Sequence, residues 1–184
     1  KEFEAAGVPF EKRIGRMLEQ VRLCRALWSG ESVDWDGRWQ LKGATLGPAP
    51  HRAGGPPIWM GGTSPGSMQR AGRYFDGWIP DPREAAHYRD GWAEVGNIAA
   101  KVGRDPAAIT GAMYLTLGID NDLAAAEARM GAFFDSYYPG RGEQIRRSRP
   151  WYAGSATGAA DYLASYEEAG ASHFVIRFAG DHEA

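Results

Sequence analysis

Two glycines and two hydroxyl side chains follow one another directly after the apolar segment 58–60, and they are Gly61, Gly62, Thr63 and Ser64. Glycines let a ligand come close to the backbone, while hydroxyl groups and the first N–H groups of a helix are donors that bind phosphate. A tight turn from a strand into a helix capped by Ser64 needs the same residue types without any ligand. The four residues therefore indicate either a phosphate site or an ordinary capped turn.

Two further side chains have the chemistry of a binding site. Trp78 could stack against a flat ring, although a chain with seven tryptophans also uses them to fill its core. Arg177 stands in the otherwise apolar segment 174–178, and a buried cation needs a partner because an unpaired internal charge is very costly. A carboxylate such as Asp76 or Asp181 would be a structural partner, and an anionic ligand would be a functional one. Both interpretations of each residue stay open at this point.

Other residues give no comparable signal. The four histidines are dispersed, and no spacing of His, Cys, Asp or Glu matches a metal site. Cys24 lies in a helical pattern without a base near it in the sequence, so we expect a small buried residue. We assign no catalytic acid or base. Residues 137–156 show no clear period, and we expect a long loop of aromatic and arginine residues that is either solvated or closes over an acidic ligand tail.

The composition excludes several classes of protein. The 184 residues are 43% hydrophobic and 24% charged, as in one globular domain. The 21 basic and 23 acidic residues provide no basic field for nucleic acid or an anionic membrane. No apolar run approaches the roughly 20 residues of a membrane span, and the N-terminus has no signal pattern. A single cysteine cannot form an intramolecular disulfide, so we expect a cytoplasmic protein.

The first 56 residues predict a helix, a hairpin and an extended lead-in. Apolar residues at helical spacing predict an amphipathic helix over 11–28. Alternating residues around Asp36-Gly37, a favoured two-residue turn, predict a β-hairpin over 32–41. Prolines and glycines over 48–57 predict a rigid segment that leads into a strand, because proline restricts its own φ and the residue before it.

From residue 57 onward, strands and helices alternate. The predicted strands are 58–60, 77–79, 112–119 and 173–178, and the predicted helices are 65–74, 83–102, 123–134 and 158–168. This alternation predicts parallel strands joined by helical crossovers, with ligands bound where the strands end. Four strands form half of a closed eight-stranded barrel, so we expect either a missing half or a partner that covers the open edges.

Several separated blocks of the sequence closely resemble the bacterial luciferase-like family of flavin-dependent oxidoreductases and monooxygenases. In order, the blocks are residues 2–10 (EFEAAGVPF), the helix that ends at Leu27-Trp28, the Asp36-Gly37 hairpin, residues 57–62 (PIWMGG) and residues 76–80 (DGWIP). Residues 170–178 resemble the last helix-to-strand passage of the family. The resemblance therefore covers essentially the whole chain.

The resemblance implies a (β/α)8 TIM barrel of which residues 1–184 are the C-terminal portion. Residues 1–56 would form the helix, hairpin and lead-in, and residues 57–184 would form the last four βα units, with strands five to eight. The chain starts at Lys1 without an initiator Met and already inside a patterned segment, so we expect a piece of a longer protein.

The resemblance also implies the ligands and partners. FMN or a deazaflavin (coenzyme F-420) would be bound by its phosphate at residues 61–64, with Trp78 and Arg177 lining the pocket and the loop 137–156 as its lid. The implied protein is an oxidoreductase or monooxygenase that acts on a small organic molecule, without nucleic acid or membrane partners. It would be a homodimer or pair with the missing N-terminal half. The alternative is a non-catalytic flavin-binding or assembly protein built from a half-barrel.

Overall fold

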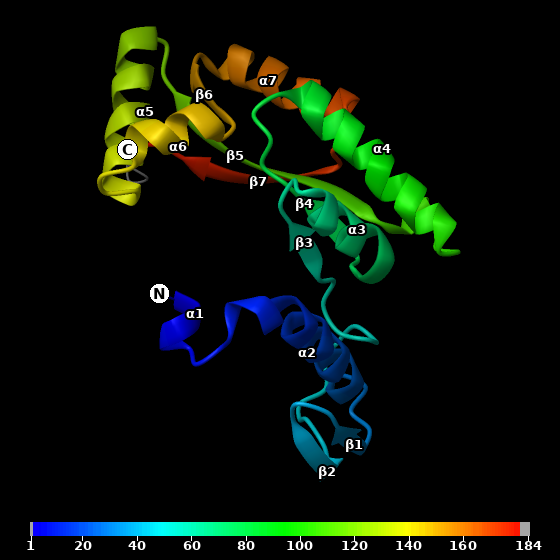
Figure 1. Ribbon diagram of the computed structural model, residues 1–184. Coiled ribbons are helices and arrows are strands. Elements are labelled where there is room, and N and C mark those ends of the chain that lie inside the picture. The colour runs from blue at the N-terminus through cyan, green and yellow to red at the C-terminus, as the bar shows by residue number, and fades with distance from the viewer. Residues whose placement is uncertain (1, 181–184) are drawn as a thin grey trace. The chain divides into compact units, whose positions relative to one another are not determined.

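The protein divides into two compact units, Lys1–Pro56 and Pro57–Ala184. A computed structural model describes residues 2–180 of the chain (Figure 1). The second unit holds all of the residues for which the sequence predicts ligand binding.

The first unit is a helix followed by a β-hairpin, as the sequence predicts. Its elements are α1 (Glu2–Ala5), the 3-10 helix η1 (Phe10–Lys12), α2 (Arg13–Leu27), β1 (Val33–Asp36) and β2 (Gln40–Ala44). The two strands pair antiparallel, with Asp36 opposite Gln40. Three residues therefore connect the strands, and the prediction of a two-residue turn is wrong.

Glu19 of α2 explains the shape of this connection. The backbone N–H of Arg38 donates to the Glu19 carboxylate at 2.6 Å, and the Arg38 guanidinium forms an ion pair with it. A β-carbon on Gly37 would collide with the same carboxylate. The turn therefore wraps around a buried acid from the helix, which local turn preferences alone cannot reveal.

Glu19 makes the stability of this unit depend on pH. The hydrogen bond from the Arg38 backbone holds the pKa of Glu19 below its ordinary value of 4.5, while burial opposes this effect. Because the folded state binds a proton less readily than the unfolded state, the carboxylate stabilises the unit above pH 4.5. We expect this contribution to be lost as the pH falls through the folded pKa, and to be missing at every pH in Glu19→Gln.

Thermal unfolding of the full chain between pH 3 and 7, followed by differential scanning calorimetry, measures this dependence. Glu31→Gln is a matched control because Glu31 is exposed. Identical pH profiles for the wild type and Glu19→Gln would contradict the assignment.

The second unit is built on a five-stranded sheet in which every pairing is parallel. The strands are β3 (Trp59–Gly61), β4 (Gly77–Ile79), β5 (Thr110–Ile119), β6 (Trp151–Gly154) and β7 (His173–Phe178). Along one edge, β5 pairs first with β4 and then, through residues 116–119, with β6. Along its other edge, residues 112–117 pair with β7. The long strand β5 is therefore the centre of the unit.

Helices cover the two faces of this sheet differently (Figure 1). The helices α3 (Pro65–Tyr74), α4 (Ala85–Lys101) and α7 (Ala156–Glu168) form the main core with the face of β5 that carries Met113, Leu115 and Leu117. The helices α5 (Leu123–Tyr137) and α6 (Gly142–Ser148) form a second core. A β-carbon on Gly118 would touch Met130 of α5, so α5 lies against the opposite face near the end of β5.

The prediction of a long loop over 137–156 is wrong. Tyr137 ends α5, and the segment continues as α6 and β6. A helix of seven residues is too short to show a clear period in the sequence. The four residues of β6 form a strand because β5 extends beyond the end of β4 and offers them free backbone groups. The other predicted strands and helices are confirmed, with ends that differ by a few residues.

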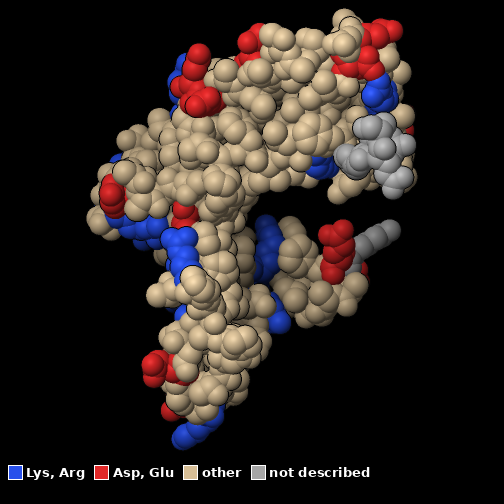
Figure 2. All heavy atoms as spheres, turned by 180° about the vertical axis from the view of Figure 1, so that it is seen from behind, with Lys and Arg blue, Asp and Glu red and all other residues tan. Residues whose placement is uncertain are grey.

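Figure 2 shows Lys and Arg interspersed with Asp and Glu on the visible face of the molecule. Within residues 2–180, no helix is both long enough and apolar enough to cross a membrane.

Candidate functional site

The turn between β3 and α3 is the centre of the candidate site. Gly62 has a φ of +93°, and a β-carbon there would lie 3.0 Å from the Ser67 hydroxyl oxygen. Ser64 is the N-cap of α3, because its Oγ accepts a hydrogen bond from the backbone N–H of Ser67 at 3.2 Å. The hydroxyl groups of Ser64 and Ser67 lie 2.8 Å apart. The capped helix that the sequence predicts at this point is confirmed.

The turn also presents backbone donors without partners. Within the described part of the chain, no oxygen accepts a hydrogen bond from the N–H of Thr63, Ser64 or Gly66. A β-carbon on Gly61 would lie 3.6 Å from the Ile79 carbonyl oxygen, which is an ordinary contact. The protein's own packing therefore does not require a glycine at position 61. Free donors beside a bare backbone fit an oxyanion such as phosphate.

Trp78 supports this turn from inside the protein. Its side chain is 1% exposed, and its ring lies 5.4 Å from that of Tyr88 and 6.5 Å from that of Trp92, between ring centres. The indole N–H donates to the Gly62 carbonyl oxygen at 2.9 Å. Trp78 is thus a core residue that also positions the turn. Stacking of Trp78 on a cofactor ring stays a prediction.

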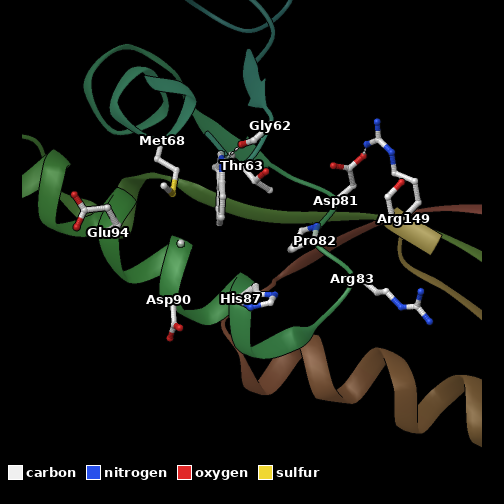
Figure 3. Close-up of a pocket in the computed structure, with 13 residues that line it drawn as sticks. Gly62, Thr63, Met68, Asp81, Pro82, Arg83, His87, Asp90, Glu94 and Arg149 are labelled. Carbon is white, nitrogen blue, oxygen red and sulfur yellow. Dashed lines mark hydrogen bonds and ion pairs between the residues drawn. The ribbon is translucent and has the colours of Figure 1, made fainter. Parts of the chain in front are cut away.

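A pocket of about 870 Å³ opens beside the turn (Figure 3). Its size is that of a site for a cofactor or a drug-sized molecule. The lining residues come from the turn, α3, β4, α4 and the segments 81–83 and 148–149; they are Gly62, Thr63, Met68, Trp78, Asp81, Pro82, Arg83, His87, Asp90, Gly91, Glu94, Ser148 and Arg149.

The charges in this pocket are unevenly distributed. Asp90 and Glu94 make the α4 wall unfavourable for an anion. Arg83 and Arg149 lie elsewhere on the rim, and Arg149 forms an ion pair with Asp81 (Figure 3). The electrostatics of the pocket therefore favour a phosphate away from α4, at the N-terminus of α3.

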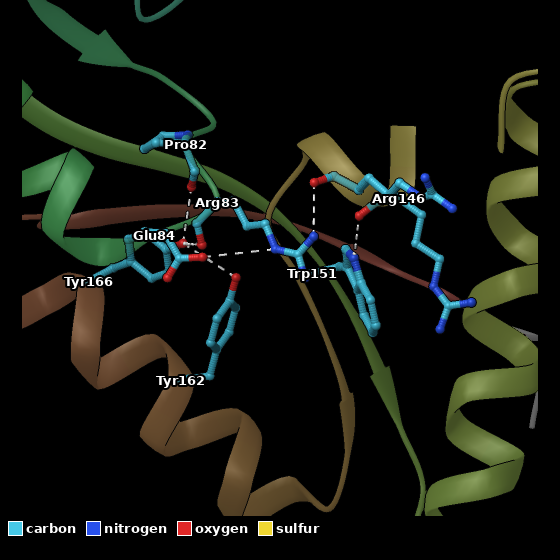
Figure 4. A network of polar contacts seen from close by, with 8 residues as sticks. Pro82, Arg83, Glu84, Arg146, Trp151, Tyr162 and Tyr166 are labelled. Carbon is cyan, nitrogen blue, oxygen red and sulfur yellow. Dashed lines mark hydrogen bonds and ion pairs between the residues drawn. The ribbon is translucent and has the colours of Figure 1, made fainter. Parts of the chain in front are cut away.

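A network of hydrogen bonds holds the segment after β4 in place (Figure 4). The Tyr166 hydroxyl donates to the carbonyl oxygens of Pro82, at 3.0 Å, and Arg83, at 2.7 Å. Burial raises the pKa of Tyr166, and the contact with the Tyr162 hydroxyl adds to the effect, so Tyr166 remains a donor at neutral pH. The Arg83 side chain in turn donates to the Arg147 carbonyl oxygen at 2.8 Å. These contacts fix one wall of the pocket to α6 and α7.

Arg177 lies apart from this pocket. Phe174 and Ile176 pack into the core with the helices α3, α4 and α7, whereas Arg177 alternates with them and faces the opposite side of the sheet. It lines a second cavity of about 150 Å³, together with Asp81, Tyr114, Tyr138, Arg149 and Pro150. The structure therefore brings residues 61–64 and Trp78 together and separates Arg177 from them.

Asp76 and Asp181 are the structural partners that the sequence suggests for Arg177. An oxygen of the Asp76 carboxylate accepts a hydrogen bond from the Ile58 backbone N–H at 2.8 Å. Asp181 lies outside the described residues. The acceptors that the structure gives Arg177 are the hydroxyl oxygens of Thr116 and Tyr138.

Sequence reasoning did not single out Asp81, although it lines both cavities. Asp81 follows β4 by two residues, so the rule that ligands bind at the carboxyl ends of parallel strands could have identified it. Arg149 lies in the segment 137–156, which the sequence predicts to be a loop. Among residues 2–180, no group of three or more His, Cys, Asp or Glu side chains is placed to hold a metal ion.

Comparisons with known proteins identify one family that this chain matches over nearly its whole length. A family model described as luciferase-like monooxygenase matches residues 1–183. The 5,10-methylenetetrahydromethanopterin reductase of Methanolobus tindarius is 33% identical over 130 residues, which are 68% of this chain and 38% of that protein. The F420-dependent glucose-6-phosphate dehydrogenase of Mycobacterium tuberculosis is 41% identical over 78 residues, which are 42% of this chain and 23% of that protein.

Solved structures share the fold. An F420-dependent secondary alcohol dehydrogenase in complex with an F420-acetone adduct has a TM-score of 0.74 and 20% identity, with coverage of 88% of this chain and 55% of the other. Riboflavin lyase with modified FMN and riboflavin has a TM-score of 0.74 and 14% identity, with coverage of 98% of this chain and 57% of the other. The chain thus spans about half the length of these structures and less than half of the two curated relatives.

Proposed function

Because the chain belongs to the luciferase-like monooxygenase family, we propose that it functions in an oxidoreductase that binds a flavin-type coenzyme by its phosphate at the β3–α3 turn. The observation that carries this proposal is the set of free N–H groups in that turn, at the edge of a pocket of about 870 Å³. The turn lies at the carboxyl end of a parallel strand, which is where α/β proteins bind ligands.

The chain's own residues bind and orient the coenzyme in this proposal. The N–H groups of Thr63, Ser64 and Gly66 and the Thr63 hydroxyl donate to the phosphate, and the N-terminus of α3 adds its partial positive charge. Gly61 leaves room for the phosphate beside the backbone, and Trp78 holds Gly62 in place. When bound, the flavin-type ring supplies the hydride or oxygen chemistry.

The relatives favour the deazaflavin coenzyme over FMN. Relatives with 33–44% identity include several proteins named as F420-dependent. Modified FMN is found in the structure of riboflavin lyase, which has only 14% identity to this chain. The coenzyme of the closer sequences is the better guide, because the residues that contact a ligand diverge more at lower identity.

The proposal extends to the architecture. The strands β3, β4, β5 and β7 correspond to strands five to eight of a (β/α)8 barrel, with β6 as an additional strand beside β5. Coverage of 55–57% of two barrel-family structures supports this correspondence. Within residues 2–180, β3 and β7 each pair along one edge only. An N-terminal half of the barrel or a second copy of the chain would cover these edges.

A titration that separates the phosphate from the ring tests the proposal. We expect FMN and the deazaflavin coenzyme to quench the tryptophan fluorescence of the chain saturably. Riboflavin, which has the ring but no phosphate, is expected to bind at least about tenfold more weakly, a loss of about 1.4 kcal/mol. Equal affinities for FMN and riboflavin, or no binding of either coenzyme, would overturn the proposal.

A further inference from the structure

We infer that the cavity beside Arg177 is a second anion site, which takes the oxyanion group of the organic substrate, a carboxylate or a phosphate ester. The assignment to the substrate rests on the proposed function, whereas the anion site itself rests only on the geometry around Arg177. This site is separate from the β3–α3 turn, because none of residues 61–64 lines the cavity beside Arg177.

The guanidinium of Arg177 is held in position by neutral groups. One nitrogen, Nη2, donates to the Thr116 hydroxyl oxygen at 2.9 Å, and Nη1 donates to the Tyr138 hydroxyl oxygen at 3.0 Å. Thr116 is fully buried and lies opposite Arg177 in the strand register. These contacts use two of the five N–H groups of the guanidinium. The buried Nε has no hydrogen-bond partner among the described residues.

Aromatic rings surround the same guanidinium. Its central carbon lies 4.8 Å from the centre of the Tyr114 ring, 5.1 Å from that of Tyr137 and 5.5 Å from that of Phe133. Rings at these distances attract a cation, but they carry no net charge and they limit the access of water. Among the described residues, the positive charge is therefore oriented and partly desolvated without being neutralised by a carboxylate.

The charged residues of the cavity lining also favour an anion. Arg177 forms no ion pair with a carboxylate within residues 2–180. Among the described residues that line the cavity, the one carboxylate, that of Asp81, is paired with Arg149. Two cations and one anion of this part of the chain therefore line a cavity of about 150 Å³, which has room for a small charged group. An oxyanion would balance the charge and accept hydrogen bonds from the N–H groups of Arg177 that have no partner among the described residues. Carboxylates and phosphates bind arginine in this way through bidentate contacts.

The position of the cavity suits a substrate group. Asp81 and Arg149 line both this cavity and the pocket of about 870 Å³, so their ion pair stands between the two spaces. A molecule whose oxyanion is held at Arg177 would thus be anchored next to the proposed coenzyme pocket.

Nitrogen-15 NMR of the arginine side chains tests the inference directly. The full chain is titrated with inorganic phosphate and with acetate, and sodium chloride at equal ionic strength serves as the reference. We expect a saturable shift of the Arg177 Nε–H signal with both oxyanions and none with chloride. The signal is identified by its loss in Arg177→Lys and independently by its change in Tyr138→Phe, which keeps the charge. A shift that follows ionic strength alone would overturn the inference.

Two variants distinguish this site from others. Arg146→Gln is a matched control, because Arg146 also lies over a ring, that of Trp151 at 4.7 Å, but does not line the cavity. The Arg177 shift should persist in it. The shift should also persist in Gly62→Ala, in which the β3–α3 turn is altered. Loss of the shift in Gly62→Ala would place the anion at the turn and overturn the inference, while leaving the proposed function intact.

A last measurement separates substrate from coenzyme. With FMN or the deazaflavin coenzyme at saturation, phosphate should still shift the Arg177 signal. Competition between coenzyme and phosphate at Arg177 would assign the site to the coenzyme and overturn the assignment to the substrate. A saturable shift in a chain that binds neither coenzyme would support the anion site while the proposed function fails.

Discussion

Replacement of Gly62 by alanine is expected to weaken the binding of FMN and of the deazaflavin coenzyme at least about tenfold. The backbone of Gly62 has a φ of +93°, and forcing another residue into such a conformation costs about 1–3 kcal/mol. The new β-carbon would also press on the Ser67 hydroxyl, which contacts the helix cap Ser64. A shift of the backbone at residue 62 or of the Ser67 side chain would relieve this strain, and either shift moves the N–H groups that we propose as phosphate donors. Fluorescence titration with each coenzyme measures the effect.

Two other glycines make this experiment specific. Gly96→Ala is the matched control, because its β-carbon would lie 3.8 Å from Pro106, an ordinary contact, and Gly96 does not line the pocket. Gly61→Ala should leave the unfolding temperature almost unchanged but lower the coenzyme affinity, because the protein leaves space there that a ligand would use. Wild-type affinity in Gly62→Ala would contradict the role of the turn.

Removal of the Trp78 ring is expected to have the largest effect on stability. The ring is 1% exposed and packs between α4 and the turn, and truncation of a buried tryptophan to alanine costs about 3–5 kcal/mol. Trp78→Phe keeps a ring but removes the N–H that binds the Gly62 carbonyl oxygen. We expect this milder change to cost about 1 kcal/mol and to lower the coenzyme affinity as well. Urea unfolding and coenzyme titration of the full chain give the two quantities.

A tryptophan of the first unit provides the comparison for this effect. Trp39 is partly buried in the unit Lys1–Pro56, and its ring interacts with Arg16. Trp39→Ala should leave the unfolding of the second unit and the coenzyme affinity unchanged. Unfolding of the second unit at the same urea concentration in Trp78→Ala and in Trp39→Ala would contradict the assigned role of Trp78.

The elements that the sequence predicts correctly are those with local signals. Ser64 followed by Pro65 marks the start of α3, because capping and a fixed proline φ act within one turn of helix. The predicted strands 77–79 and 173–178 agree with β4 and β7 residue for residue. The wrong predictions occur where a contact with a distant residue decides the local structure, as Glu19 does for the hairpin turn and β5 does for β6.

The sequence by itself determined the alternation of strands and helices, the glycine and hydroxyl residues of the β3–α3 turn and the need of Arg177 for a partner. Only the tertiary structure decided that Trp78 binds the Gly62 carbonyl oxygen and that Arg177 faces hydroxyl groups and rings on the other side of the sheet. The physical reason is the range of the interactions. Capping, turn formation and periodicity act between neighbours, whereas a charge or a buried N–H is satisfied by whichever distant residue the strand pairing brings beside it.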